Sequence, residues 1–288
     1  MKIPQELLRQ IDKNKAVLFV GAGLSQEAGL PGWPELLREM LVWAGKHGIT
    51  LSDQDSRELQ AYIEACDFLL VAEEMRDRLG KEHFRRYMTE TFHRPELTPT
   101  DTHRILPHIP FSAVLTSNYD NLLETAYTVA LGLTPRVFTQ VETPELMAAH
   151  RDGKFYILKV HGTIDRIDTL VLSRQDYREV MLMKPAYRLF LINLLVSNTV
   201  LFLGFGLSDP DWLLLLDQLQ AISQGYCGPH YALMETTSIG PLMCRRFEKD
   251  YGIQILPYTA STKSHSQQIK MFLAQLANEI KQVKAAHY

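Results

Sequence analysis

The amino-acid sequence predicts an α/β protein in which helices cover both faces of a parallel β-sheet. Short runs rich in Val, Ile, Leu, Phe and Tyr recur along the chain, and their near-continuous apolar character is typical of strands buried on both faces. Stretches with apolar residues at helical spacing separate these runs. The predicted strands are AVLFVG from residue 16, FSAVLTS from 111, FYILKVHG from 155, TVLFLGFG from 199, HYALM from 230 and IQILPY from 253.

About ninety residues separate the first two predicted strands, far more than a loop and one helix require. From Pro34 to Lys46 the apolar residues follow helical spacing, and SRELQAYIEACDFLLVAEEMRDRLG continues in the same way. We therefore expect one domain with a helical insertion over 36–104 and a Rossmann-like core formed by 12–35 and 105–262.

A C-terminal helix is predicted over 264–286, because its apolar residues lie on one stripe. We expect this stripe to pack on the core of the same chain, and a contact between subunits of an oligomer is the alternative. The stripe consists of Ile269, Phe272, Leu276, Ile280 and Val283.

Composition and charge exclude several classes of protein. The chain has 288 residues and a formal net charge of −3, so bulk binding to nucleic acid or to an anionic membrane is not expected. Residues 1–15 lack the continuous apolar core of a signal peptide, and the longest apolar runs are far shorter than the ~20 residues of a membrane-spanning helix. We expect a cytoplasmic protein.

Neither the cysteines nor the histidines predict a metal site. The three cysteines are far apart and form no Cys-x-x-Cys pair, so they cannot supply four thiolates to a structural zinc ion. The histidines between 83 and 108 are ten, ten and five residues apart, which does not place ligands on one helix face.

Glycine-rich turns follow two of the predicted strands, at the edge where open α/β sheets bind ligands. In Gly21-Ala22-Gly23 the third glycine of G-x-G-x-x-G is missing, because Gln26 takes its place, and the P-loop lysine is absent. Such glycines let backbone N–H groups approach an anion, but a tight turn without a ligand would use the same residues. In the turn with Gly204 and Gly206, the following Asp209 is expected to cap the next helix.

Three polar side chains stand out in the other turns. Asn118 and Asp120 come directly after the second strand, where burial would require partners for them, and capping of the next helix is the alternative role. His161 follows the third strand, either as a hydrogen-bonded core residue or as a general base.

Together these turns resemble the motifs of the sirtuins, and more closely those of the zinc-free, sirtuin-like NAD-consuming domains of bacterial anti-phage defence. GAGLSQEAGLPGW resembles the first motif of the family, TSNYDNL its T-Q-N-x-D motif, KVHG its His-Gly motif and LGFGLSDP its late glycine-rich motif. VLSRQDYREVM, HYALM and GIQILPY also resemble the defence-type subgroup, so the resemblance covers about residues 12–260.

The resemblance implies an NAD site built from these turns. Asn118 would orient the nicotinamide ribose or an attacking water, Asp120 would bind the nicotinamide carboxamide, and His161 would be the general base. Trp33 would cover the reacting sugar. The small residues would line the rest of the site, with Gly21, Ala22, Gly23 and Ser25 at the pyrophosphate and Gly204 and Gly206 on the adenosine side.

Departures from the deacylating sirtuins decide which activity is expected. Gly32-Trp33-Pro34 stand where those enzymes carry Asp-Phe-Arg, Ser117 replaces Gln, and the zinc-binding cysteine pairs are missing. The zinc lobe supports the acyl-peptide cleft of those enzymes. We therefore expect no zinc lobe and no metal, and an NAD hydrolase that releases nicotinamide and ADP-ribose as the effector of an anti-phage defence system.

Other activities stay open at this point. A protein deacylase would use NAD to release acetyl groups from acyl-lysine, an ADP-ribosyltransferase would leave ADP-ribose on a macromolecule, and an NAD-sensing module would bind NAD without turnover. Because NAD depletion is lethal, we expect control by assembly into a homo-oligomer or by a partner protein in trans. The resemblance suggests a ring-shaped DNA-translocase-type ATPase as such a partner.

Overall fold

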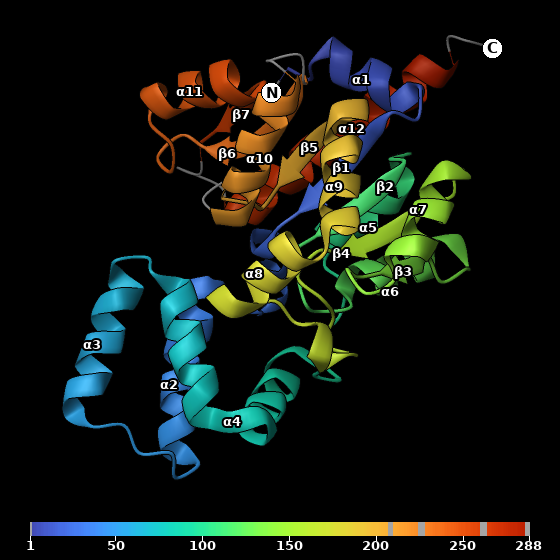
Figure 1. Cartoon of the computed structure of the whole chain (residues 1–288). Coiled ribbons are helices and arrows are strands. Elements are labelled where there is room, and N and C mark those ends of the chain that lie inside the picture. Colours follow the sequence, from blue (N-terminus) through green and yellow to red (C-terminus); the bar gives the residue numbers. More distant parts are fainter. Residues whose placement is uncertain (1, 207–209, 224–227, 260–263, 286–288) are drawn as a thin grey trace.

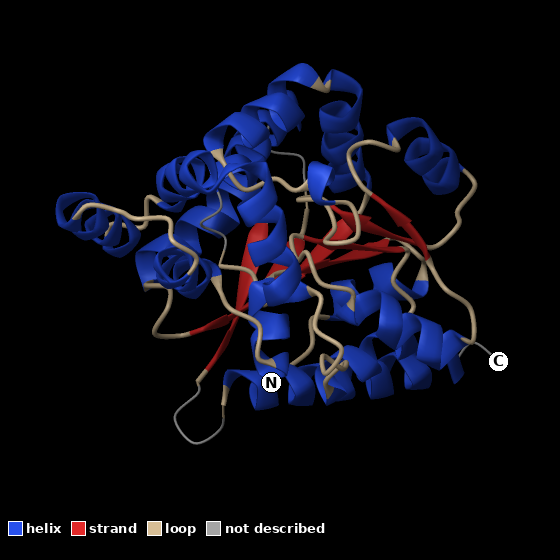
Figure 2. Ribbon diagram, turned by 90° about the horizontal axis from the view of Figure 1, so that it is seen from below, coloured by secondary structure: helices blue, strands red, loops and turns tan. Residues whose placement is uncertain are grey.

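The computed structural model describes residues 2–206, 210–223, 228–259 and 264–285. A parallel sheet in the order β3-β4-β2-β1-β5-β6-β7 runs through its centre, with helices on both sides (Figure 1, Figure 2). The predicted α/β fold is thereby confirmed. The strands are β1 (Ala16–Val20), β2 (Ala113–Thr116), β3 (Arg136–Phe138), β4 (Tyr156–Lys159), β5 (Thr199–Leu203), β6 (His230–Glu235) and β7 (Ile253–Tyr258).

The sequence analysis missed β3. This strand has three residues, lies at the edge of the sheet beside β4, and buries only Phe138 fully. A short edge strand that is partly exposed needs no continuous apolar run, so the pattern that identified the other strands does not include it.

Each face of the sheet has its own apolar core, because successive strand residues point to opposite faces. On β1, Val17 and Phe19 belong to one cluster and Leu18 and Val20 to the other. The first cluster includes α7 (Thr143–Arg151), α8 (Arg174–Met183), α9 (Pro185–Ser197), α10 (Pro210–Ser223) and α11 (Pro241–Tyr251). The second includes α1 (Gln5–Asp12), α5 (Asp101–Ile105), α6 (Leu122–Leu131) and α12 (His265–Ala285). Asp209, the predicted cap of α10, lies outside the described residues.

The C-terminal helix α12 packs on the core of its own chain, as expected. Ile269, Phe272, Leu276 and Ile280 are buried in the second cluster, whereas Val283 near the end of the helix is only half-buried. The apolar stripe is therefore used within the chain over most of its length.

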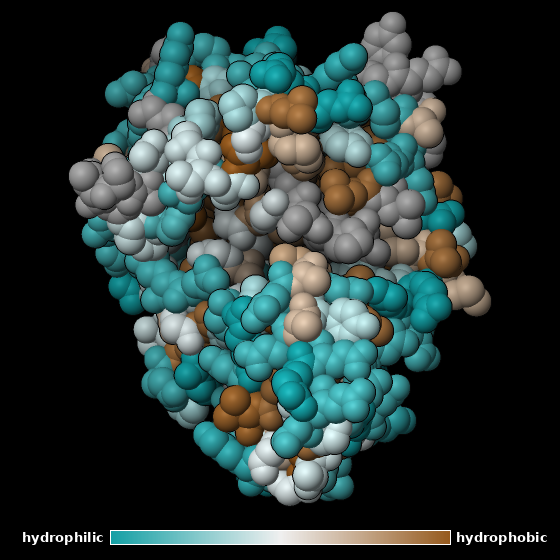
Figure 3. Space-filling model, turned by 90° about the vertical axis from the view of Figure 1, so that its left-hand side faces the viewer, coloured by the Kyte–Doolittle hydropathy of each residue, from teal (hydrophilic) through white to brown (hydrophobic). Residues whose placement is uncertain are grey.

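A group of helices between β1 and β2, which we call the insertion, forms a third cluster away from the sheet (Figure 1). It comprises α2 (Trp33–Lys46), α3 (Asp53–Glu64) and α4 (Phe68–Phe92), which bends at Gly80, where φ is 63°. Tyr119 from the turn after β2 and Ile164 from the turn after β4 reach into this cluster, so the insertion packs directly on the candidate site. In Figure 3 its outer surface, in the lower part of the molecule, is mainly hydrophilic.

No single helix among the described residues is both long and apolar enough to cross a membrane. The helices α8 and α9 reach that threshold only when taken together, and the break between them bends the pair by 81°.

Candidate functional site

The sheet order brings the predicted turns together. In the order β4-β2-β1-β5, Val20 pairs with Thr116 on one side and with Leu203 on the other, and Thr116 pairs in turn with Lys159. The turns that follow these four strand ends therefore lie side by side at one edge of the sheet, where open α/β sheets bind ligands.

A cavity of about 690 Å³ opens at this edge, a volume typical of small-molecule sites. The turns after β1, β2 and β5 form one side of it, and the insertion contributes Trp33, Phe68 and Phe92 to the other. The sequence-predicted residues that line it are Ala22, Gly23, Ser25, Trp33, Asn118, Asp120, Gly204 and Gly206. Gly21 and His161 are not part of this lining.

Gly21 and Gly204 allow the turns after β1 and β5 to pack closely against each other. A Cβ on Gly21 would lie 2.5 Å from the carbonyl oxygen of Gly204, and Gly204 itself has a φ of +60°. The N–H groups of Gly21 and Gly23 donate to the carbonyls of Leu203 and Gly204, each at 2.9 Å. These two N–H groups are therefore already used, and among the described residues no acceptor takes the N–H of Ala22.

The chain after Gly21 continues as a short 3-10 helix, η1 (Ala22–Ala28). The next α-helix, α2, begins only at Trp33. A helix dipole that could attract an anion to this glycine turn would therefore have to come from η1. With so few aligned peptides in η1, that dipole is weak.

Ser25, Asn118 and Asp120 form one buried hydrogen-bond network on the sheet side of the cavity. The Ser25 hydroxyl donates to Asp120 Oδ2 at 2.8 Å and accepts from Asn118 Nδ2 at 2.9 Å. Asn118 Nδ2 also donates to the carbonyl of Gly21 at 3.2 Å. A carbonyl can only accept, so this contact fixes which end of the Asn118 amide carries nitrogen.

The remaining oxygen of that amide, Asn118 Oδ1, has no hydrogen-bond donor among the described residues, although it is buried. Buried polar atoms in folded proteins nearly always have a partner. Since Asn118 lines the cavity, its free acceptor is suited to a hydroxyl or a water molecule held there.

Both carboxylate oxygens of Asp120 have partners within the chain. Its Oδ1 accepts from the N–H of Leu122, the first residue of α6, at 3.0 Å. Its Oδ2 accepts from Ser25. Each carboxylate oxygen can take a second hydrogen bond, so Asp120 can still bind a donor in the cavity.

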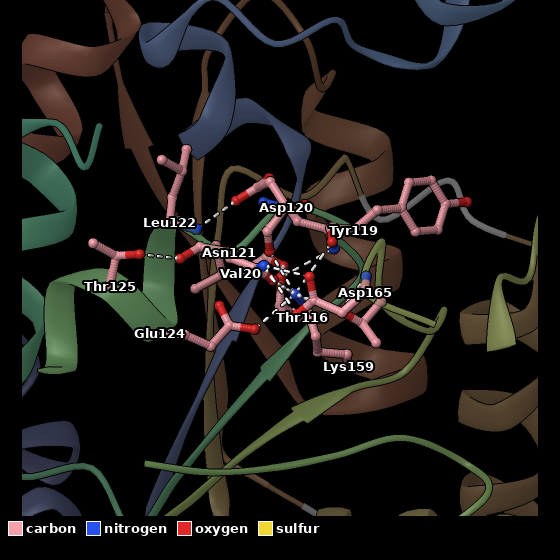
Figure 4. Close-up of polar contacts among 12 residues, drawn as sticks. Val20, Thr116, Tyr119, Asp120, Asn121, Leu122, Glu124, Thr125, Lys159 and Asp165 are labelled. Carbon is pink, nitrogen blue, oxygen red and sulfur yellow. Dashed lines mark hydrogen bonds and ion pairs between the residues drawn. The ribbon is translucent and has the colours of Figure 1, made fainter. Parts of the chain in front are cut away.

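Lys159 is a buried charged residue at the candidate site that the sequence analysis did not single out. Its side chain is fully buried, and its ammonium group lies beneath the turn that carries Tyr119 and Asp120 (Figure 4). It pairs with Glu124 Oε1 at 2.7 Å and donates to the carbonyls of Tyr119 and Asp120. Further oxygen partners are Asn121 Oδ1 at 3.0 Å and Thr163 Oγ1 at 3.4 Å.

This lysine fixes the shape of the turn, because one ammonium group binds several of its oxygens. Burial raises the pKa of Glu124, and the neighbouring Lys159 charge opposes this shift. A charged residue inside an otherwise apolar strand rarely stays buried without partners. The lysine in FYILKVHG was thus the available sign of a buried polar centre.

His161 is buried, with 5% of its surface exposed, and it borders a separate small cavity of about 20 Å³ instead of the large one. Its Nε2 lies 3.3 Å from the hydroxyl of Tyr177. Tyr177 is one of the residues that line the large cavity. The turn after His161 requires Gly162, where φ is +84° and a Cβ would lie 2.1 Å from the carbonyl oxygen of Thr169.

The insertion supplies the apolar wall of the cavity. The rings of Trp33 and Phe68 stack with their centroids 6.0 Å apart. At the same wall, Arg174 Nη2 on α8 donates to both carboxylate oxygens of Asp67 at 2.7 and 2.8 Å, which ties α8 to the insertion. Within the described parts of the chain, no group of three or more His, Cys, Asp or Glu side chains is arranged to hold a metal ion.

Sequence comparison finds relatives whose names concern NAD and defence. The chain is 29% identical to the NAD(+) hydrolase ThsA of Enterococcus faecium over 78% of this chain and 44% of that protein. It is 28% identical to the ThsA of Cytobacillus dafuensis over 76% and 40%, and 26% identical to defense-associated sirtuin 2 of Bacillus subtilis over 76% and 21%. The chain thus spans less than half the length of these curated relatives.

Structure and family comparisons agree on the fold. A mutant Sir2 homologue solved in complex with ADP-ribose superposes with a TM-score of 0.52 at 12% identity, covering 98% of both chains. The family model described as a SIR2-like domain matches residues 112–256, half of the chain. The chain therefore belongs to the family of SIR2-like domains.

Proposed function

We propose that this chain is an NAD+ glycohydrolase, which cleaves the N-glycosidic bond of NAD to release nicotinamide and ADP-ribose. The observation that carries the proposal is the buried Asn118 Oδ1, which no described residue bonds and which lies beside Ser25 and Asp120 at a cavity of about 690 Å³. Relatives named as NAD(+) hydrolases support it.

The proposed binding mode divides NAD along the cavity. Asp120 takes the amide of nicotinamide as a second donor, and Trp33 covers the reacting ribose. The pyrophosphate lies against Ser25 and the free N–H of Ala22, with Gly21 and Gly23 holding that turn in place. Gly204 and Gly206 leave room on the adenosine side.

The proposed reaction passes through an oxocarbenium-like state at the anomeric carbon of the ribose. As the bond to nicotinamide breaks, nicotinamide leaves with the electron pair and a water oxygen bonds to that carbon. Asn118 Oδ1 accepts a hydrogen bond from this water or from a ribose hydroxyl and so fixes its position. His161 is the final acceptor of the water proton.

The experiment that tests this function is incubation of the purified protein with NAD, with and without an acyl-lysine peptide, followed by chromatography of the products. We expect nicotinamide and free ADP-ribose in equal amounts without peptide. NAD loss that requires the peptide would identify a deacylase, and ADP-ribose attached to a macromolecule would identify a transferase. A rise in melting temperature with NAD but no turnover would identify a sensing module.

We also propose a biological setting, which rests on the relative named as a defense-associated sirtuin. The chain would deplete cytoplasmic NAD as an effector of anti-phage defence, controlled in trans by assembly into a homo-oligomer or by a partner such as a ring-shaped translocase ATPase. Size-exclusion chromatography with light scattering, combined with activity measurements on each fraction, tests the assembly. An active form that is a lone monomer would contradict it.

A further inference from the structure

We propose that Tyr177 is the group through which His161 acts on the substrate, so that its hydroxyl relays the proton from the reacting water to the imidazole. The proposal rests on the proposed function and assigns a catalytic role to a residue that its motif alone did not single out. The starting observation is that His161 does not line the large cavity, whereas Tyr177 does.

The two side chains form a buried pair. The Tyr177 hydroxyl lies 3.3 Å from His161 Nε2, and the rings meet edge to face with centroids 5.3 Å apart and an interplanar angle of 74°. Exposed fractions are 4% for Tyr177 and 5% for His161. At this separation the hydroxyl is within reach of the imidazole, and of the two residues Tyr177 is the one that lines the large cavity.

Both partners are held by their own backbone contacts. The carbonyl of His161 accepts from the N–H of Val171 at 2.9 Å. Tyr177 lies in the first turns of α8, where Ser173 and Asp176 form a capping box that fixes the helix start. Asp176 also binds Arg76 of the insertion. The backbone positions of Tyr177 and His161 are therefore fixed by the fold.

In the proposed relay, two protons move in a single concerted step. The attacking water gives one proton to the Tyr177 oxygen while the Tyr177 hydroxyl gives its own proton to His161 Nε2, which requires the imidazole tautomer protonated at Nδ1. Tyr177 is unchanged, His161 becomes imidazolium and later releases the proton to solvent. The overall products are nicotinamide, ADP-ribose and one proton.

The variant Tyr177→Phe removes only the hydroxyl and keeps the ring packed against His161. We expect kcat to fall about 10²–10⁴-fold, as for loss of a general base, whereas KM, melting temperature and ADP-ribose binding stay near those of the parent. In the double variant with His161→Ala, we expect no further loss of kcat, because the two groups act as a unit.

The matched control is Tyr187→Phe. Tyr187 is fully buried and borders the small cavity behind His161, and no described residue bonds its hydroxyl. Loss of an unpaired buried hydroxyl costs little, so kcat and melting temperature should match the parent.

Full activity of Tyr177→Phe beside an inactive His161→Ala would overturn the relay while leaving the proposed function intact. A fall in melting temperature, together with a rise in KM as large as the fall in kcat, would assign Tyr177 a structural role. That result would also overturn the relay. An inactive parent would instead overturn the proposed function, so the two failures are distinguishable.

Discussion

The two sides of the cavity differ in how they are built. On the sheet side, Ser25, Asn118 and Asp120 are almost fully buried and bonded to one another, and Lys159 fixes their turn from below. On the insertion side, stacked aromatic rings line the cavity, and the polar link at the cavity wall is the half-exposed Asp67–Arg174 pair. The difference suggests that the sheet edge holds the groups that need precise geometry, whereas the insertion shapes the space around them.

The largest effect on stability is expected at the sheet edge, from Lys159→Met. Removing one partner of a buried ion pair typically costs about 3–5 kcal/mol, because the Glu124 carboxylate and the turn carbonyls lose their cation. Urea unfolding measures the loss. The double variant Lys159→Met/Glu124→Leu should recover much of it, and an equally unstable double variant would show that the carboxylate is not the cause.

Acid should weaken the sheet before the insertion. Burial lowers the pKa of His230 on β6 to about 4, and its Nδ1 accepts from the N–H of Val200 at 3.1 Å. Because the folded pKa lies below the ordinary value of 6.5, the unfolded chain takes up the proton first. The unfolding free energy then falls as pH drops from 6.5 towards 4, by at most about 1.4 kcal/mol per pH unit for this group.

Urea unfolding across this pH range checks the sign. His230→Asn keeps an acceptor for Val200 without a titrating ring and should flatten the slope. His108→Gln, at an exposed position, should not change it. A slope that His230→Asn leaves unchanged would assign the acid sensitivity to another group, such as His103, whose pKa burial also lowers.

The aromatic wall should affect binding more than chemistry. Trp33→Ala removes one side of the stacked pair with Phe68, an interaction of about 1 kcal/mol, and we expect a several-fold higher KM for NAD with a smaller change in kcat. Trp43→Ala, on the same helix but outside the cavity lining, is the control. A loss confined to kcat would place Trp33 with the catalytic groups and would erase the contrast between the two sides.

The smallest effect is expected from the pair at the rim. Asp67→Asn breaks a contact whose side chains are 34% and 48% exposed, and exposed ion pairs contribute about 0–1 kcal/mol. Asp152→Asn, which breaks the exposed pair with Lys154, should give a similar small loss. A much larger effect of Asp67→Asn would mean that this link holds the insertion in place.

Much of the fold was predictable because strands buried on both faces have a continuous apolar pattern. The strand β3 was not predicted because a partly exposed edge strand lacks that pattern. The predicted polar residues Asn118 and Asp120 do meet Ser25, since parallel strands end at one edge. What the sequence could not show was side-chain direction. His161 borders a separate small cavity and contacts Tyr177 of the large one, and the Lys159 side chain binds a turn that is distant in sequence.

Gly21 and Gly204 also show what a sequence pattern leaves undecided. Sequence reasoning assigned Gly21 and Gly204 to a ligand, yet each is also required by the close approach of the other's turn. A pattern along the chain indicates that a backbone must be approached closely, but not whether a ligand or another segment approaches it. Only the three-dimensional packing distinguishes the two.

The central claim is that Asn118 holds the reacting group during NAD cleavage. Its most direct test is the rate of nicotinamide release from NAD by the purified parent, by Asn118→Ala and by Asn193→Ala, a control at an exposed position on α9. We predict turnover by the parent and the control, and a loss of at least about 10²-fold in Asn118→Ala with the melting temperature retained. Parental turnover in Asn118→Ala would contradict the account.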